Sequence, residues 1–248
     1  MGNNIWVVLP AYNESLDLLN LMTRISNYAK WQKRWNVNLL VVNDGSTDNT
    51  SEIAKNAELF CNKYVLDINP NKGLANAVRQ GFNYVLSQSV SDDDILVIQD
   101  ADDTQSPFLI DDMACQILKG SDVVIASRYR DGARILGLTS FRKLTSWCAG
   151  AIFRVFTPVK GVRDYTCGFR AYKVGILRKA DKTFGAKFIE EEGFACMAEI
   201  LLKLKKIDAI FHEVPMILRY DRKQGASKMN VARTIKQTLN LVKKHAFR

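Results

Sequence analysis

Three short acidic segments have the composition of ligand-binding loops. Each follows a run of apolar residues of strand length; they are Pro10-Ala-Tyr-Asn-Glu14, Asn43-Asp-Gly-Ser-Thr-Asp48 and Asp100-Ala-Asp-Asp103. In an open parallel sheet, ligands bind at the carboxyl ends of the strands. If the preceding apolar runs are strands of one such sheet, the three segments lie at one edge and form one site.

The pair Asp100 and Asp102 indicates a metal site. Two carboxylates one residue apart, directly after a buried strand, converge on a small volume, and their like charges are costly without a cation between them. Mg²⁺ and Mn²⁺ take carboxylate oxygens and complete their shells with water and phosphate, so either ion would neutralise a diphosphate leaving group. The alternative interpretation is a solvated turn before Pro107.

The other two loops have simpler interpretations when each is taken alone. Asp44 and Asp48 fit a turn followed by a helix cap, and Glu14 fits an acid that complements a helix dipole. Only the coincidence of three acidic strand ends favours a shared binding function.

Several other chemistries are excluded or disfavoured by what the 248 residues lack. There is no GxGxxG or GxxxxGK[ST] segment, and the two histidines belong to no HExxH motif or triad. The five cysteines are odd in number and form no CxxC pair, so we expect reduced thiols and a cytoplasmic protein. No leader peptide is recognisable, and no apolar run reaches the roughly 18–20 residues that span a bilayer.

The loops must be positioned by alternating strands and helices. Apolar runs predict strands at 4–9, 37–42, 64–67, 95–99, 123–126 and 209–214. Helical periodicity or composition predicts helices at 16–31, 46–60, 74–87, 108–119, 138–156, 190–205 and 231–247. This order predicts an α/β fold with a doubly wound, mostly parallel sheet. We expect one domain over residues 1–248, elaborated in its C-terminal half and ending in an amphipathic helix.

Charge divides the chain into two unlike halves. The formal net charge is +9, yet residues 1–127 hold 9 basic and 16 acidic side chains, and residues 128–248 hold 26 and 10. Such asymmetry indicates two surfaces with different partners. A nucleic-acid-binding module is the remote alternative, because no RNA-recognition motif accompanies the basic residues. We therefore expect no nucleic-acid partner.

Seven segments in order resemble the inverting family 2 glycosyltransferases, and among these the dolichol- or polyprenyl-phosphate mannose and glucose synthases. They are PAYNE (10–14), VNDGSTD (42–48), NKGLANAVRQG (71–81), DADD (100–103), ASRY (126–129), TCGFRAY (166–172) and RKQGASK (222–228). The resemblance implies a GT-A, Rossmann-like fold with a nucleotide-sugar-binding half (1–127) and an acceptor-binding half (128–248). It also implies transfer of a hexose from GDP-mannose or a UDP-sugar to a polyprenyl or dolichyl phosphate, with a hydroxyl group of a glycan as the alternative acceptor.

The same resemblance assigns roles to individual residues. Nucleotide-sugar binding falls on Pro10, Ala11, Tyr12, Glu14, Asp44, Lys72, Asp100, Ala101 and Asp102, and metal binding on Asp100, Asp102 and Gln105. Catalytic roles fall on Asp102, Asp164, Arg128, Arg222 and Lys228, and acceptor-phosphate binding on Arg142, Arg170, Arg222 and Lys228. For a hydroxyl acceptor, Asp164 or Glu191 is the candidate general base.

The acceptor half carries a second pattern, which concerns membranes. Residues 128–163 contain eight basic side chains and one acidic one, around the apolar segment 147–156. A core helix is the ordinary explanation, but a helix lying on an anionic membrane has the same pattern. We therefore expect a peripheral protein on the cytoplasmic face of a membrane, held there by the lipid surface or by a membrane-anchored partner.

Overall fold

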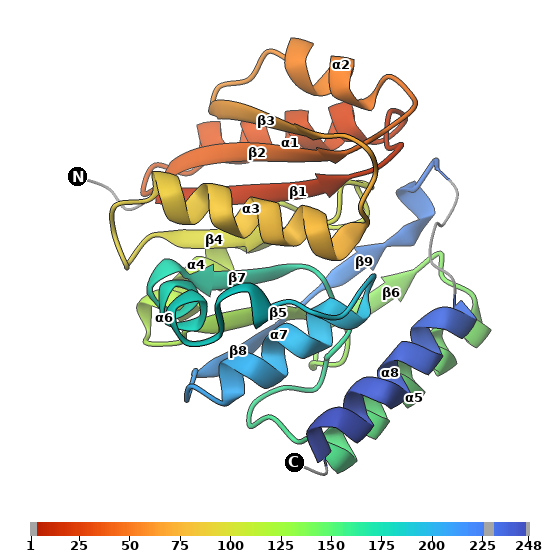
Figure 1. The fold of residues 1–248 in the computed structure, drawn as a ribbon. Helices are drawn as coiled ribbons and strands as arrows, with labels where there is room; N and C mark the ends of the chain where they lie inside the picture. The colour runs from red at the N-terminus through yellow and green to blue at the C-terminus, as the bar shows by residue number, and fades with distance from the viewer. Residues whose placement is uncertain (1–3, 226–230, 247–248) are drawn as a thin grey trace.

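A seven-stranded sheet forms the centre of the molecule, in the order β3-β2-β1-β4-β7-β5-β8 (Figure 1). The computed structural model describes residues 4–225 and 231–246. The strands are β1 (Asn4–Ala11), β2 (Asn36–Asp44), β3 (Asn62–Ile68), β4 (Ile95–Ile98), β5 (Val123–Ser127), β7 (Arg170–Lys173) and β8 (Phe211–Pro215). All neighbouring pairs are parallel except those of β7, which runs antiparallel to β4 and β5. The predicted mostly parallel, doubly wound sheet is confirmed.

Helices cover both faces of this sheet, with α3, α6 and α7 on one side and α1 and α4 on the other (Figure 1). The helices are α1 (Leu18–Trp31), α2 (Thr50–Asn56), α3 (Leu74–Gln88), α4 (Leu109–Leu118), α5 (Ser140–Phe156), α6 (Val174–Phe184), α7 (Ala195–Lys205) and α8 (Val231–Ala246). Two short 3₁₀ turns occupy Gly185–Lys187 and Tyr220–Arg222. Because both faces are covered, the central strands are continuously apolar rather than alternating.

The register of the first strands brings the predicted loops to one edge. Val8 of β1 is opposite both Leu40 of β2 and Ile98 of β4, and these side chains are buried. The three strands run parallel from this level, so their carboxyl ends and the loops that follow lie together. This is the geometry that the three acidic segments predicted.

The C-terminal half adds elements that the sequence pattern did not predict. A two-stranded parallel sheet pairs β6 (Arg134–Leu136) with β9 (Ile217–Arg219), and β7 and α6 were also missed. The helix predicted at 190–205 begins only at Ala195, because residues 190–194 form a loop in which Gly193 has a φ of 57°. Helices α5 and α8 pack side by side, away from the main sheet (Figure 1).

Candidate active site

A cavity of about 710 Å³ lies at the carboxyl ends of β1, β2 and β4 and extends toward α5, α7 and α8. The predicted site residues that line it are Pro10, Ala11, Tyr12, Glu14, Asp44, Lys72, Asp100, Ala101, Asp102, Gln105 and Arg128. They come from positions up to 118 residues apart in the chain (Pro10 to Arg128), and the sheet edge brings them together. Their roles in binding stay predictions.

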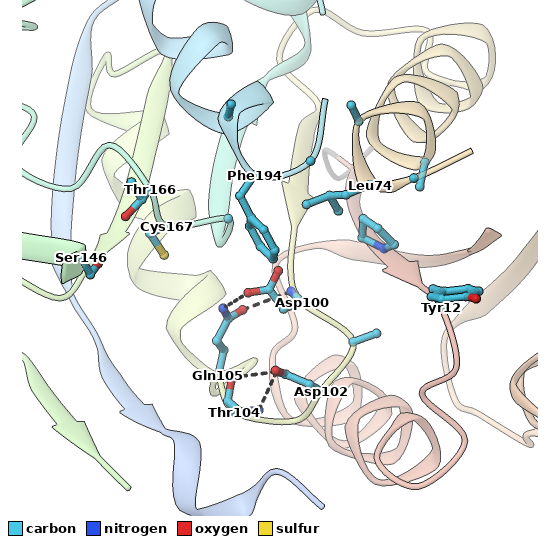
Figure 2. A pocket seen from close by; sticks show the side chains of 18 of the residues that line it. Tyr12, Leu74, Asp100, Asp102, Thr104, Gln105, Ser146, Thr166, Cys167 and Phe194 are labelled. Atoms are coloured by element: carbon cyan, nitrogen blue, oxygen red, sulfur yellow. Dashed lines mark hydrogen bonds between the residues drawn. The ribbon is translucent and has the colours of Figure 1, made fainter. Parts of the chain in front are cut away.

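The loop after β4 holds its two carboxylates in fixed positions. Gln105 donates from Nε2 to Asp100 Oδ2 at 2.7 Å, and its Oε1 accepts the Asp100 backbone N–H at 3.2 Å (Figure 2). Asp102 Oδ1 accepts from the Thr104 hydroxyl at 2.7 Å and from its backbone N–H at 3.3 Å. Both carboxylates border the same cavity, as the spacing predicted, and the Gln105 amide is hydrogen-bonded to Asp100 at both ends.

The electrostatics of this pair favour a cation. Burial, together with the neighbouring Asp102 charge, raises the pKa of Asp100 to about 6 against the opposing effects of Gln105, Lys223 and Arg128. A carboxyl group whose ionised form is disfavoured in this way gains most from a nearby positive charge. Within the described part of the chain, no three His, Cys, Asp or Glu side chains gather into a metal cluster. Any ion at Asp100 and Asp102 would therefore need further ligands from an amide, water or phosphate.

Lys223 supplies one such positive charge, and the sequence analysis missed it. Its Nζ lies 2.7 Å from Asp102 Oδ2, and the two side chains are 9% and 14% exposed. Burial alone would lower the pKa of Lys223, but the Asp102 carboxylate reverses this and raises it. Lys223 could have been found from the sequence, because it follows Arg222 in the RKQGASK segment. The sequence analysis selected only Arg222 and Lys228 from that segment.

Gly168 allows the backbone to approach Asp100 closely. A Cβ added at Gly168 would lie 3.0 Å from Asp100 Oδ1, which is tighter than ordinary van der Waals contact. We expect Gly168→Ala to displace this carboxylate by a few tenths of an ångström and to lower about tenfold the rate of the hexose transfer that the resemblance implies. The measurement is the initial rate of that reaction, next to a urea unfolding curve for each variant.

Gly150→Ala is the matched control for that substitution. Its Cβ would meet Arg163 O at 3.6 Å, an ordinary contact, and alanine favours the α5 helix. Equal rates in the two variants would contradict the close approach at Gly168.

Arg128 lines the cavity and is paired with the buried carboxylate of Asp164. Its Nε and Nη2 donate to Asp164 Oδ2 and Oδ1 at 2.8 and 2.7 Å, and its Nη2 also donates to the Thr166 hydroxyl. Burial would raise the pKa of Asp164, but the Arg128 guanidinium holds it below its usual value. The side chain of Asp164 is fully buried in this pair. Asp164 therefore positions Arg128, and its prediction as a general base does not fit the structure.

Arg170 also departs from its predicted role as a ligand of the acceptor phosphate. It is fully buried in β7, where its guanidinium donates to the carbonyl oxygens of Met197 and, at 2.8 Å, of Tyr165. These contacts join β7 to α7 and to the loop that precedes β7. Arg170 is not among the residues that line the cavity, and its observed contacts hold β7 in place.

Two further predicted residues, Arg222 and Glu191, are described by the structure but are not among the residues that line the cavity. Arg222 is solvent-exposed at the end of the 3₁₀ turn Tyr220–Arg222, and Glu191 faces Lys244 of α8 at 3.6 Å. Lys228 and the side chain of Arg142 lie outside the described residues.

Asp44 organises the loop that follows β3. Its carboxylate accepts from Asn71 Nδ2 at 2.9 Å and from the backbone N–H groups of Lys72 and Gly73 at 3.0 and 2.6 Å. The loop 71–73 is thereby held at the acidic side of the cavity, which Asp44 and Lys72 both line.

The opposite wall of the cavity is mainly apolar. Phe194 of the 190–194 loop projects over Asp100 (Figure 2). The other apolar lining residues on this side are Leu138, Phe153, Ala195, Ala198, Met216 and Leu218. Thr145, Ser146 and Thr166 add hydroxyl groups to the lining, of which Thr166 contacts Arg128, and α8 contributes Gln237 and Thr238. The cavity thus has an acidic wall, which holds Asp44, Asp100 and Asp102, and a wall that is richer in apolar side chains and also carries Glu192.

Comparison with known proteins agrees with this architecture. Residues 6–180 match the family Glycosyl transferase family 2, to which the chain belongs. It is a glycosyltransferase, similar to enzymes that mannosylate polyprenyl phosphates.

Two curated relatives show the extent of this similarity. The dolichol-phosphate mannosyltransferase of Pyrococcus furiosus is 30% identical over 90% of this chain, but the chain spans only 58% of its length. The polyprenol monophosphomannose synthase of Mycolicibacterium smegmatis is 28% identical over 90% of the chain and 80% of its own length.

Solved structures show the same GT-A fold. Glucosyl-3-phosphoglycerate synthase from Mycobacterium tuberculosis superposes with a TM-score of 0.68 at 18% identity, over 99% of this chain and 80% of its own. Mannosyl-3-phosphoglycerate synthase from Rubrobacter xylanophilus superposes with a TM-score of 0.69 at 19% identity, over 98% of this chain and 73% of its own. The predicted fold class is confirmed.

Proposed function

We propose that this glycosyltransferase is metal-dependent and inverting, and that it moves a hexose from GDP-mannose or a UDP-sugar to a polyprenyl or dolichyl phosphate. The observation that carries the proposal is the cavity with two unlike walls. Its acidic wall suits a cation with a nucleoside diphosphate, its apolar side chains suit an isoprenoid chain, and Arg128, which also lines the cavity, supplies a positive charge for an anionic acceptor. The relatives' names, which specify dolichol and polyprenol phosphates, support the same acceptor class.

Asp100 and Asp102 fit a divalent cation. Mg²⁺ is commonly bound through one or two carboxylates together with substrate phosphates, so Asp100 and Asp102 are enough on the protein side. Burial of Asp100 next to Asp102 also favours a positive charge between them. Glucosyl-3-phosphoglycerate synthase has been solved with Mn²⁺ and UDP, which supports the metal for this fold. When bound, the ion would neutralise the diphosphate leaving group.

The chain's own residues would then bind and orient the two substrates. In the proposed step, a phosphate oxygen of the acceptor forms a bond to the anomeric carbon, and the bond to the nucleoside diphosphate breaks on the opposite side. Arg128, held rigid by Asp164, would present a fixed positive charge to the acceptor phosphate. An ionised phosphate needs no general base, which agrees with the inaccessible position of Asp164.

The exposed surface of α5 supports a peripheral place on a membrane, and we propose that this is its cytoplasmic face. Trp147, Val155 and Phe156 of α5 are exposed, and the Arg154 guanidinium lies over the Trp147 ring. Such a basic and apolar surface suits an anionic bilayer. Among the described residues, no helix is long and apolar enough to cross one.

A donor and acceptor screen tests the proposed reaction. The protein is incubated with radiolabelled GDP-mannose, UDP-glucose or UDP-GlcNAc, each with polyprenyl phosphate and Mg²⁺ or Mn²⁺. We expect label in the lipid with one donor, and loss of at least about 90% of the rate when EDTA removes the metal. Transfer to a glycan hydroxyl but not to lipid phosphate would establish the alternative acceptor class.

A further inference from the structure

The Lys223–Asp102 ion pair occupies an oxygen that the proposed metal site needs. Lys223 Nζ lies 2.7 Å from Asp102 Oδ2, while Asp102 Oδ1 already accepts from Thr104. Mg²⁺ lies about 2.0–2.1 Å from the carboxylate oxygens that bind it. An ammonium group at hydrogen-bonding distance from the same oxygen would be repelled by that ion, so the two cations exclude each other.

Lys223 is held at this place by a short segment, residues 219–225, which we call the strap. At one end, the Arg219 backbone N–H donates to Thr104 O at 2.8 Å, within the loop that carries Asp102. At the other end, the backbone N–H groups of Gln224 and Gly225 donate to the buried carboxylate of Asp17 at 3.1 and 3.2 Å. The strap thus brings Lys223 to Asp102 through contacts that do not involve the Lys223 side chain.

The middle of the strap is packed closely as well. Asp221 lies against Gly137, whose φ is 77° and where an added Cβ would overlap the Asp221 backbone. Because the strap is anchored on both sides of Lys223, the ammonium group can leave Asp102 while the backbone stays in place. A released Lys223 would remain beside the cavity that it lines.

We propose that Lys223 is a tethered counter-ion of Asp102, which holds the carboxylate until a divalent cation replaces it. The inference rests on the proposed metal site and adds a residue to it. Metal loading is then an exchange of one cation for another rather than the filling of a bare acidic pair. Released Lys223 becomes available to the phosphate oxygens of the donor.

Binding of Mn²⁺ alone, followed by electron paramagnetic resonance, tests the exchange without any reaction. We expect Lys223→Met to bind Mn²⁺ at least about tenfold more tightly than the unaltered chain, since no internal cation competes. Arg219→Met is the matched control, because it removes a charge from the same strap whose partner is Asp221. It should leave Mn²⁺ affinity within about twofold, and Asp102→Asn should abolish binding.

Lysine acetylation of the unaltered chain, read by mass spectrometry, is the second measurement and needs no variant to fold. Saturating Mn²⁺ should speed acetylation of Lys223 at least about fivefold, and leave exposed Lys33 unchanged. Equal Mn²⁺ affinity in Lys223→Met and the unaltered chain, or an unchanged acetylation rate, would overturn the exchange while leaving the metal site intact. Absence of Mn²⁺ binding in both proteins would overturn the metal site itself, and the exchange with it.

Discussion

Replacing Asp102 by asparagine is expected to lower glycosyl transfer by about a thousandfold. The change removes the negative charge of the carboxylate that pairs with Lys223. In the proposed reaction, the same carboxylate binds the divalent cation that accompanies the nucleotide-sugar. The amide keeps the shape of the side chain, and its oxygen still accepts from Thr104. Stability should therefore fall by no more than about 2 kcal/mol, the cost of leaving Lys223 without its partner. Initial rates and urea unfolding curves check both expectations.

Asp103→Asn is the matched control for this experiment. Asp103 is the adjacent acid, pairs with Arg24 and is not among the residues that line the cavity. Its φ of 52° suits asparagine, so the backbone needs no change. We expect this variant to retain its rate within about threefold. If Asp102→Asn kept a rate similar to that of Asp103→Asn, Asp102 would not be part of the active site.

Replacing Arg128 by methionine is expected to lower both stability and transfer. The substitution leaves the carboxylate of Asp164 fully buried without its positive partner, and such losses cost about 3–5 kcal/mol. Transfer should also fall at least about a hundredfold, because Arg128 lines the cavity where the acceptor phosphate is proposed to bind. Urea unfolding gives the first quantity, and initial rates at saturating donor give the second.

The double variant Arg128→Met with Asp164→Asn separates these two effects. Neutral asparagine still accepts from the Cys167 backbone N–H but carries no buried charge. At least about half of the lost stability should return, whereas transfer should stay low. Lys173→Met is the control, since its exposed pair with Asp93 contributes less than about 1 kcal/mol. If the double variant regained its rate, Arg128 would act only as a structural partner of Asp164.

The acidic wall of the site was predictable because it depends on local patterns. Apolar strands that end in polar loops predict where a parallel sheet binds its ligands, and Asp44, Asp100 and Asp102 are found there. No knowledge of the packing between distant segments is needed for that step.

Roles that depend on packing between distant segments were not predictable in this way. The TCGFRAY segment offered Arg170 as a ligand of the acceptor phosphate, but β7 inserts between β4 and β5 and buries it. Asp164 became a candidate base because its partner Arg128 is 36 residues away in the chain. Lys223 was passed over because Asp102 is 121 residues before it. In each case the chemistry of the side chain depends on a partner that the sequence does not place.

The position of β7 also affects how the chain folds as it is synthesised. Its residues are made well after β4 and β5, yet it is the neighbour of both, and the other neighbour of β5 is the still later β8. At about 5–20 residues per second, a ribosome needs about 2–9 s to pass from the end of β5 to the end of β7. During that interval one edge of β4 and both edges of β5 lack their partners, which exposes them to aggregation. The first 127 residues hold most of the acidic wall, but β4 and β5 gain the neighbour that joins them only with β7, so chaperones have their main opportunity to act before residue 173 emerges.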